Sequence, residues 1–201
     1  MISEIDLFNS SKDLSNSWAV WPKTGDSTLP FFLSNLNALH VDIVFLGYQH
    51  SEEVKTDFIN FHNKSSRGDN RLKMFFKTKG LDRLKGAFMT NLFDPTKNKS
   101  FDKKIAVDQL KQKMKFYAAN LRKIICIGDN TFEDVCSGLD INYKDYEKQP
   151  GKKNLRLASV KVGDETWKIF RVYKHSSYGN HQKLGDIELP AQLKYINDLI
   201  F

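Results

Sequence analysis

Stretches of apolar residues alternate along the chain with amphipathic and polar segments. The clearest apolar stretch is Val41–Gly47, which after Asp42 is apolar on both faces, as in a strand buried inside a parallel sheet. The polar residues 48–50 follow it, and Ser51 with the acidic residues after it indicates the start of a helix. A strand ending in glycine, a short polar loop and a helix together form the place where open α/β sheets bind ligands.

Further strands are predicted over 86–93 and 122–128. The turn residues 163–166 separate two more apolar stretches, 157–162 and 167–173, and predict a hairpin. Apolar residues at helical spacing predict helices over 27–40, 51–62, 71–77, 105–120, 129–139 and 190–199.

Strands that alternate with helices favour an α/β fold. We expect a three-layer α/β/α sandwich with a mostly parallel central sheet of about four strands. The 201 residues fit one domain, 1–201, in which the polar segment 1–27 forms an N-terminal arm.

Net charge and composition limit the classes of partner and the cellular location that we expect for the protein. The net charge of +7 fits a polyanionic partner, and it fits a generally basic soluble surface equally well. Cys126 and Cys136 lack metal-type spacing and are expected to be buried, reduced thiols. The sequence shows no secretory signal and no apolar run of membrane-spanning length. We therefore expect a monomeric cytoplasmic protein without a membrane partner, a metal or a cofactor.

Three polar residues near strand ends are candidates for chemistry. Gln49 is neutral and cannot act as a general base, but its amide can position a water molecule or hydrogen-bond a base. Asn91 carries the adjacent donor and acceptor needed to read a nucleobase edge, or it only ties the following loop. His175 lies in a loop crowded with polar, aromatic and basic side chains, which is typical of a binding loop.

Basic residues near these loops are candidates for phosphate contacts, although each one also fits a solvated surface charge. They are Lys64, Arg67, Arg71, Lys73 and Lys174. The sequence contains no phosphate-binding glycine motif, no metal-ligand spacing and no Ser-His-Asp order that stands out.

Taken together, the loops resemble the uracil-DNA glycosylase superfamily, especially its mismatch-specific and single-strand-selective branches. Residues 45–50 occupy the place of that family's first motif, and Phe61 lies where the family has the aromatic that stacks on the flipped base. Residues 68–73 resemble the family's G-N-R-F-W segment, 86–91 its base-reading strand, and 175–178 its second motif.

The resemblance implies a role for each of these positions. His175 would support the departing base, Asn91 would read its edge, Phe61 would stack on it with Tyr48 nearby, and Gln49 would position water. DNA contacts would come from Arg67, Arg71, Lys174, Ser177, Tyr178 and Asn180. The chain departs from the family where Gln49 replaces the water-handling Asp or Asn, and where His50, Ser176 and Tyr178 stand in place of the motif residues, including the prolines.

Three functions stay open from the sequence. The first is a DNA glycosylase that hydrolyses the N-glycosidic bond of uracil or another damaged or modified base flipped from DNA. The second is a glycosylase-like module that binds DNA without cutting the bond. The third is a nucleoside or nucleotide enzyme built on a similar sheet, which would bind a free nucleoside but not DNA.

Overall fold

The structure is a computed structural model. It describes residues 16–23, 27–49, 60–63, 66–77, 80–93, 101–114, 121–142, 147–148, 155–173 and 180–199, without the side chains of 121, 147–148 and 180–185. The prediction of a helix over 51–62 lies mainly outside these residues, and the described end of that segment, 60–61, is a turn.

The described strands form one seven-stranded mixed sheet in the order β1-β3-β2-β4-β7-β6-β5. The four central strands, β3, β2, β4 and β7, are mutually parallel, and β1, β6 and β5 add antiparallel edges. The strands are β1 (Ser17–Trp18), β2 (His40–Gln49), β3 (Ala87–Phe93), β4 (Leu121–Ile127), β5 (Glu147–Lys148), β6 (Arg156–Val162) and β7 (Glu165–Val172). The expected α/β fold is confirmed, and the sheet is wider than the four strands expected.

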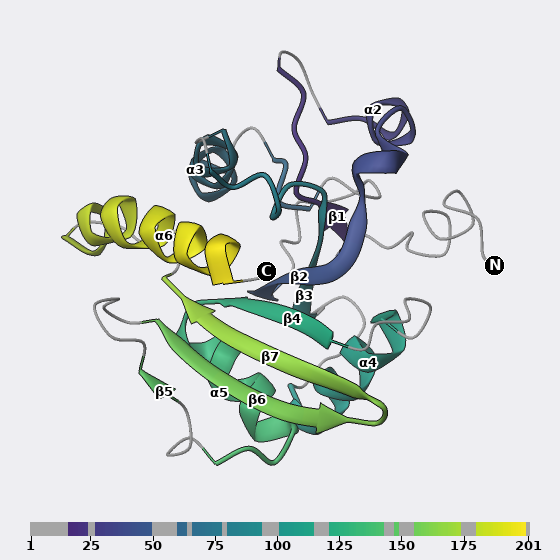
Figure 1. The fold of residues 1–201 in the computed structure, drawn as a ribbon, viewed down its shortest axis with the longest axis vertical. Coiled ribbons are helices and arrows are strands. Elements are labelled where there is room, and N and C mark those ends of the chain that lie inside the picture. Colours follow the sequence, from purple (N-terminus) through teal and green to yellow (C-terminus); the bar gives the residue numbers. More distant parts are fainter. Residues whose placement is uncertain are drawn as a thin grey trace.

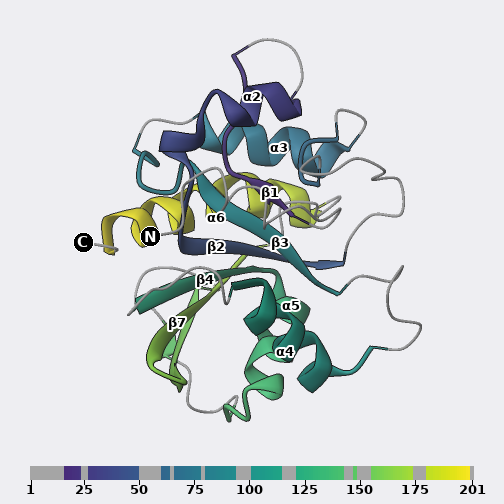
Figure 2. The same cartoon turned by 90° about the vertical axis from the view of Figure 1, so that its right-hand side faces the viewer.

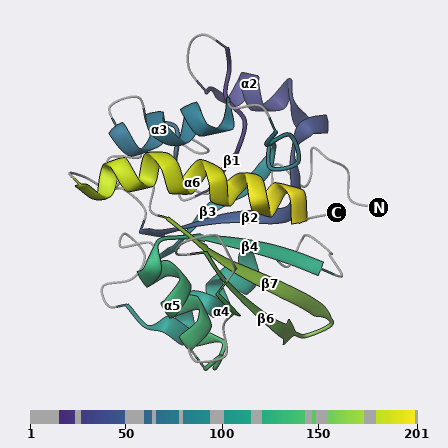
Figure 3. The same cartoon turned by 60° about the vertical axis from the view of Figure 1, so that its left-hand side comes forward.

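Helices cover both faces of this sheet (Figures 1 and 2). On one face lie α3 and α6, with α2 and the 3-10 turn η1 beside them, and on the other lie α4 and α5 (Figure 3). The bounds are α2 (Leu29–Leu33), η1 (Leu36–Ala38), α3 (Arg67–Phe76), α4 (Lys103–Met114), α5 (Asp129–Gly138) and α6 (Asn180–Leu199). Among the helices that the structure describes, none is long and apolar enough to cross a membrane.

The core has two parts because successive side chains of a strand point to opposite faces. In β2, Ile43 and Phe45 pack into the cluster beneath α3 and α6. Val44 and Leu46 pack into the cluster beneath α4 and α5. All four are almost fully buried, which explains the continuous apolar run that marked this strand in the sequence.

The helix predicted over 27–40 is broken into α2 and η1. The helix starts within two residues of the predicted position, but its cap is the Thr28 hydroxyl and not Asp26 or Ser27, the caps that the sequence suggests; Pro30 lies in the first turn. Its early end has a local cause. The side chains of Ser34 and Asn35 both donate hydrogen bonds to the Phe31 carbonyl, at 2.8 Å each, and compete with the backbone.

Two other helices start earlier than their sequence signals predicted. α3 begins at Arg67 rather than 71, because the Ser66 hydroxyl accepts the Asp69 N–H at 3.2 Å and caps it there. α6 begins at Asn180 and contains Pro190, the residue at which the sequence predicts its start. Leu189, Leu193 and Ile196 are buried against the sheet, so packing on both sides of the proline sustains one helix.

Candidate functional site at the carboxyl ends of β2 and β3

The four parallel strands place their carboxyl ends along one edge of the sheet. Gly47 of β2 is paired with Asn91 of β3. Its neighbour Leu46 pairs with Cys126 of β4, which in turn pairs with Arg171 of β7. The paired residues therefore form a row across the sheet, which runs from Asn91 through Gly47 toward the last residues of β4 and β7. Open α/β sheets bind their ligands along this kind of edge.

Gly47 is required at its position by space. A Cβ there would lie 2.3 Å from Asn91 Oδ1 and 2.8 Å from Phe61 Cζ, and contacts that short do not occur. The absence of a side chain lets the amide of Asn91 and the ring of Phe61 approach the backbone of β2 together. The resemblance assigned Phe61 and Asn91 to base binding, and the structure places both side chains beside the backbone of Gly47.

Asn91 holds a buried hydrogen-bond donor. Asn91 is only 3% exposed, and its side-chain Nδ2 has no hydrogen-bond partner within the described part of the chain. A buried donor without a partner costs about 1–3 kcal/mol, so proteins seldom keep one without a reason. A ligand acceptor that reached this atom would remove the cost.

Phe61 is the second unusual residue of the site. It is 5% exposed and has φ +65°, in the left-handed region that a bulky side chain rarely adopts. Such a conformation costs about 1–3 kcal/mol and persists only where its surroundings enforce it. The contacts of its neighbours His62 and Asn63 provide that enforcement.

Both ring nitrogens of His62 form hydrogen bonds that fix the segment carrying Phe61. Its Nε2 lies 3.0 Å from the Trp18 carbonyl, which can only accept, so Nε2 carries the proton. Nδ1 is then free to accept from the Ser27 hydroxyl at 2.7 Å. Burial lowers the pKa of His62 to about 3, the bond to Trp18 opposes this shift, and nearby Lys73 adds to it. His62 is therefore a neutral, fixed ring at physiological pH.

Asp69 holds the other side of the same segment. Its carboxylate accepts the Asn63 N–H at 3.0 Å. Burial raises the pKa of Asp69, and its hydrogen bonds partly offset that shift. Sequence reasoning did not single out His62 or Asp69, since nothing in the local pattern shows that distant residues will enclose them.

The remaining predicted residues of the sheet edge lie apart from one another. Gln49 is exposed at the end of β2 and, two residues beyond Gly47, is on the same face. Tyr48 is on the opposite face, where its ring lies 5.6 Å from that of Phe101. Desolvation raises the pKa of Tyr48, and Asp134 adds to the shift. The structure thus does not bring Tyr48 to Asn91, because one residue of register reverses the face.

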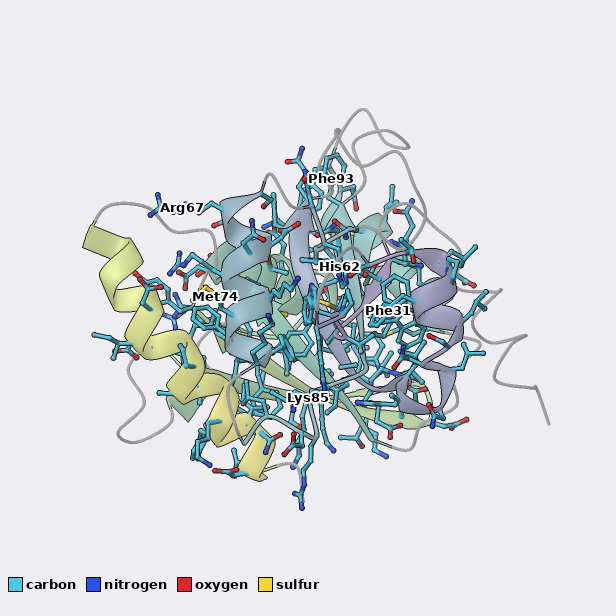
Figure 4. The ribbon with its side chains drawn as sticks, turned by 90° about the horizontal axis from the view of Figure 1, so that it is seen from above. Phe31, His62, Arg67, Met74, Lys85 and Phe93 are labelled. Atoms are coloured by element: carbon cyan, nitrogen blue, oxygen red, sulfur yellow. The ribbon has the colours of Figure 1, made fainter. Side chains whose placement is uncertain are left out.

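The two predicted arginines differ from each other. Arg67 is exposed at the start of α3, on the same side of the molecule as Phe93 (Figure 4). Arg71 is buried and ion-paired with Asp186 of α6, with 2.6 Å between Nη2 and Oδ1. This pair joins α3 to α6, so Arg71 is engaged within the protein rather than open to a phosphate.

Several predicted residues fall outside the described part of the chain: Lys64, Lys174, His175, Ser177 and Tyr178. Asn180 is the first residue of α6, and its side chain is also outside it. Among the described residues, no group of three His, Cys, Asp or Glu side chains is arranged to hold a metal ion.

The chain was compared with models of known families and with curated proteins. No family model and no curated protein matches it.

Proposed function

We propose that this protein binds a nucleobase extruded from DNA, with Asn91 hydrogen-bonded to the edge of the base and Phe61 against its face, and hydrolyses its N-glycosidic bond. The observation that carries the proposal is the buried amide nitrogen of Asn91, which has no partner among the described residues. The Asn91 side chain lies with that of Phe61 beside Gly47, at the carboxyl edge of a parallel sheet. The finer description of the fold, a three-layer α/β/α sandwich, is part of the same proposal and agrees with the helices on both faces.

A nucleobase has groups that complement both side chains. Its edge offers acceptors to the Asn91 Nδ2 donor and its flat face offers an apolar surface to Phe61. Stacking of a base on an aromatic side chain contributes about 1–3 kcal/mol. A base inside a duplex presents neither feature freely, so it would have to leave the stack to enter the site.

Hydrolysis would need two further groups. A water oxygen bonds to C1′ of the sugar as the C1′–N bond breaks, and the base departs with the bonding electrons and then takes a proton. Gln49, exposed on the same face of β2, would orient that water through its amide oxygen. His175 would donate a hydrogen bond to the departing base, and stabilising that developing charge is the main catalytic contribution.

The topology supports a contribution from the residues after β7. Val172 ends β7 and pairs with Ile127 of β4. That places the end of β7 two strand spacings from Gly47, about 10 Å across the edge. We therefore propose that a histidine in the segment after Tyr173 contributes to the same site.

A second candidate function is base binding without hydrolysis. It is favoured by Gln49, which occupies the end of β2 with a neutral amide that cannot accept a proton from water. The two functions share the same binding site and differ only in whether the glycosidic bond is broken.

An oligonucleotide assay tests the proposal. Single strands and duplexes that contain uracil or another damaged or modified base are incubated with the full chain, and alkali then cleaves any abasic product. We expect cleavage with the wild type and its loss in Asn91→Ala and His175→Ala, with Asn37→Ala, an exposed residue of η1, as the control. DNA binding without cleavage of any substrate would favour the second function, and cleavage unchanged in Asn91→Ala would refute the assigned site.

A further inference from the structure

A pocket lies away from the sheet edge that carries Asn91. It has a volume of about 230 Å³ and is formed by the segment after β1, the C-terminal half of α3 and the turn before β3. Figure 4 shows Lys85, one of its lining residues, on the opposite side of His62 from Phe93, the last residue of β3. The pocket is therefore separate from the carboxyl-edge site.

The wall of this pocket is aromatic and held in place. The ring of Trp21 lies 5.0 Å from that of Phe76 and 4.8 Å from that of His62, with interplanar angles of 36° and 32°. Phe76 in turn packs on Phe45 of the central strand β2. The wall is thus anchored to the core, and a ligand would meet a preformed apolar surface.

Four lysines line the same pocket: Lys23, Lys73, Lys77 and Lys85. Lys85 is ion-paired with Asp82 at 2.5 Å. The other three have no ion pair with any acidic residue in the described part of the chain. The pocket therefore combines an apolar wall with uncompensated positive charge.

Lys73 and Lys77 lie close enough for their positive charges to repel each other. The two residues are one helical turn apart at the end of α3, where like charges repel by a few tenths of a kcal/mol. The negative end of the helix dipole favours cations at that terminus. It does not account for Lys23 and Lys85, which come from other segments and line the same space.

We propose that this pocket binds a nucleotide, with the heterocycle against the Trp21–Phe76 wall and the phosphate held by Lys73 and Lys77. Lysine binds phosphate as a point charge and needs no fixed geometry, which suits side chains contributed by separate segments. The volume of about 230 Å³ is below the about 300–1,000 Å³ of most ligand pockets, so we expect a ligand no larger than one nucleotide to be enclosed.

The bound nucleotide could come from two sources: it is either a free mononucleotide or a nucleotide within a DNA strand. The proposal does not depend on the base-binding site, because the pocket shares none of the residues Gly47, Phe61 and Asn91. An Asn91→Ala variant should therefore leave the pocket intact.

Tryptophan fluorescence offers a direct readout. The chain has three tryptophans, of which Trp18 and Trp167 are almost fully buried and Trp21 is partly exposed at the pocket. Titration of the full chain at low salt with dAMP, dTMP, adenosine, inorganic phosphate and a five-residue oligothymidylate would report a ligand beside Trp21. Calorimetry on the same solutions would give the affinities.

We expect quenching by the mononucleotides or by the oligonucleotide, and weaker binding by at least about tenfold in the double variant Lys73→Gln/Lys77→Gln. The matched control is Lys104→Gln/Lys111→Gln, which removes the same charge from α4 on the other face of the sheet. Quenching by mononucleotides identifies a free ligand, and quenching by the oligonucleotide alone identifies a strand.

Three results would overturn the proposal. They are no binding of any nucleotide by the wild type, equal weakening in the two lysine double variants, and phosphate binding as tightly as dAMP. A Trp21→Leu variant separates the two parts of the ligand, since it should weaken dAMP and leave phosphate binding unchanged. Thermal unfolding of each variant shows whether it is folded at the temperature of the titration.

Discussion

Gly47 and Asn91 face each other across two parallel strands so closely that a methyl group on Gly47 would lie 2.3 Å from the Asn91 amide oxygen. The same methyl group would lie 2.8 Å from the ring of Phe61. The missing side chain at position 47 thus sets the positions of both residues that we assign to base binding. The site depends on the space at one glycine.

A Gly47→Ala substitution should therefore damage both the fold and the site. The added methyl group displaces Asn91 and Phe61, and overpacking of this kind costs about 1–3 kcal/mol in the free energy of unfolding. Urea denaturation measures that cost, and DNA-binding assays measure the accompanying loss of base preference. The control is Gly163→Ala in the β6–β7 turn, where a Cβ meets no atom within 4 Å although φ is +61°. Gly163→Ala should strain the turn and leave base preference unchanged, and equal loss in both variants would contradict the assignment.

The sequence predicted the parallel strands well because burial on both faces leaves a continuous apolar run. β2, β3, β4 and the β6–β7 hairpin lie within a few residues of their expected bounds. The edge strand β1 was missed, since two residues, Ser17 and Trp18, carry no pattern and acquire strand geometry only by pairing with β3. Local signals also misled at Pro190, where tertiary packing extends α6 past a residue that usually begins a helix.

The site was predictable in part for a similar reason. Gly47, Phe61 and Asn91 were placed together through a resemblance of motif order, and strand register brings them together. Tyr48 was assigned to base binding with Phe61 and Asn91, but Tyr48 directly follows Gly47 in β2, and adjacent residues of a strand face opposite sides. His62 could not be found from sequence, because its role depends on contacts with Trp18 and Ser27, 44 and 35 residues away.

The buried neutral His62 makes stability depend on pH. Its pKa is about 3 in the folded protein against 6.5 for an unperturbed imidazole. Between these values the unfolded chain binds a proton that the folded protein does not. The contribution of His62 therefore lowers stability as pH falls through this window, by about 1.4 kcal/mol per pH unit. Its effect fades as the pH rises past 6.5, where the unfolded chain also loses the proton.

Chemical denaturation from pH 7.5 to 4 in the wild type and in His62→Gln measures this dependence. Other groups contribute equally to both proteins, so the difference between the two curves isolates His62. We expect the wild type to lose more stability on acidification than the variant does. Parallel curves would show that His62 is not held neutral in the fold.

Breaking the buried pair Arg122–Glu165 should lower the free energy of unfolding strongly. The Arg122 side chain is fully buried and donates two hydrogen bonds to Glu165, at 2.9 and 2.6 Å, and one to the Val41 carbonyl at 3.1 Å. A Glu165→Ala change would remove the carboxylate that accepts two hydrogen bonds from the buried Arg122 guanidinium, at a cost of about 3–5 kcal/mol. Urea denaturation at pH 7 measures the loss. The exposed pair Lys111–Asp108 is the control, because Asp108→Asn should change stability by less than about 1 kcal/mol.

Cys126 and Cys136 should be unreactive in the folded protein. Both are buried, and burial raises the pKa of Cys136 to about 12 and that of Cys126 well above its usual range. Because the thiolate is the reactive species, a disulfide reagent at pH 8 should modify neither residue before unfolding and both in guanidinium. Rapid reaction of either thiol under native conditions would contradict the burial of β4 beneath α5.

Base extrusion into the Gly47–Asn91 site is the central claim, and 2-aminopurine fluorescence tests it most directly. This base is quenched when stacked, so placing it beside a uracil or another target base reports whether the target leaves the helix. The account predicts a rise in fluorescence when the wild-type protein binds, and a much smaller rise with Asn91→Ala at saturating protein. Saturated DNA binding with no change in fluorescence, or an equal rise in the variant, would contradict the claim that Asn91 receives an extruded base.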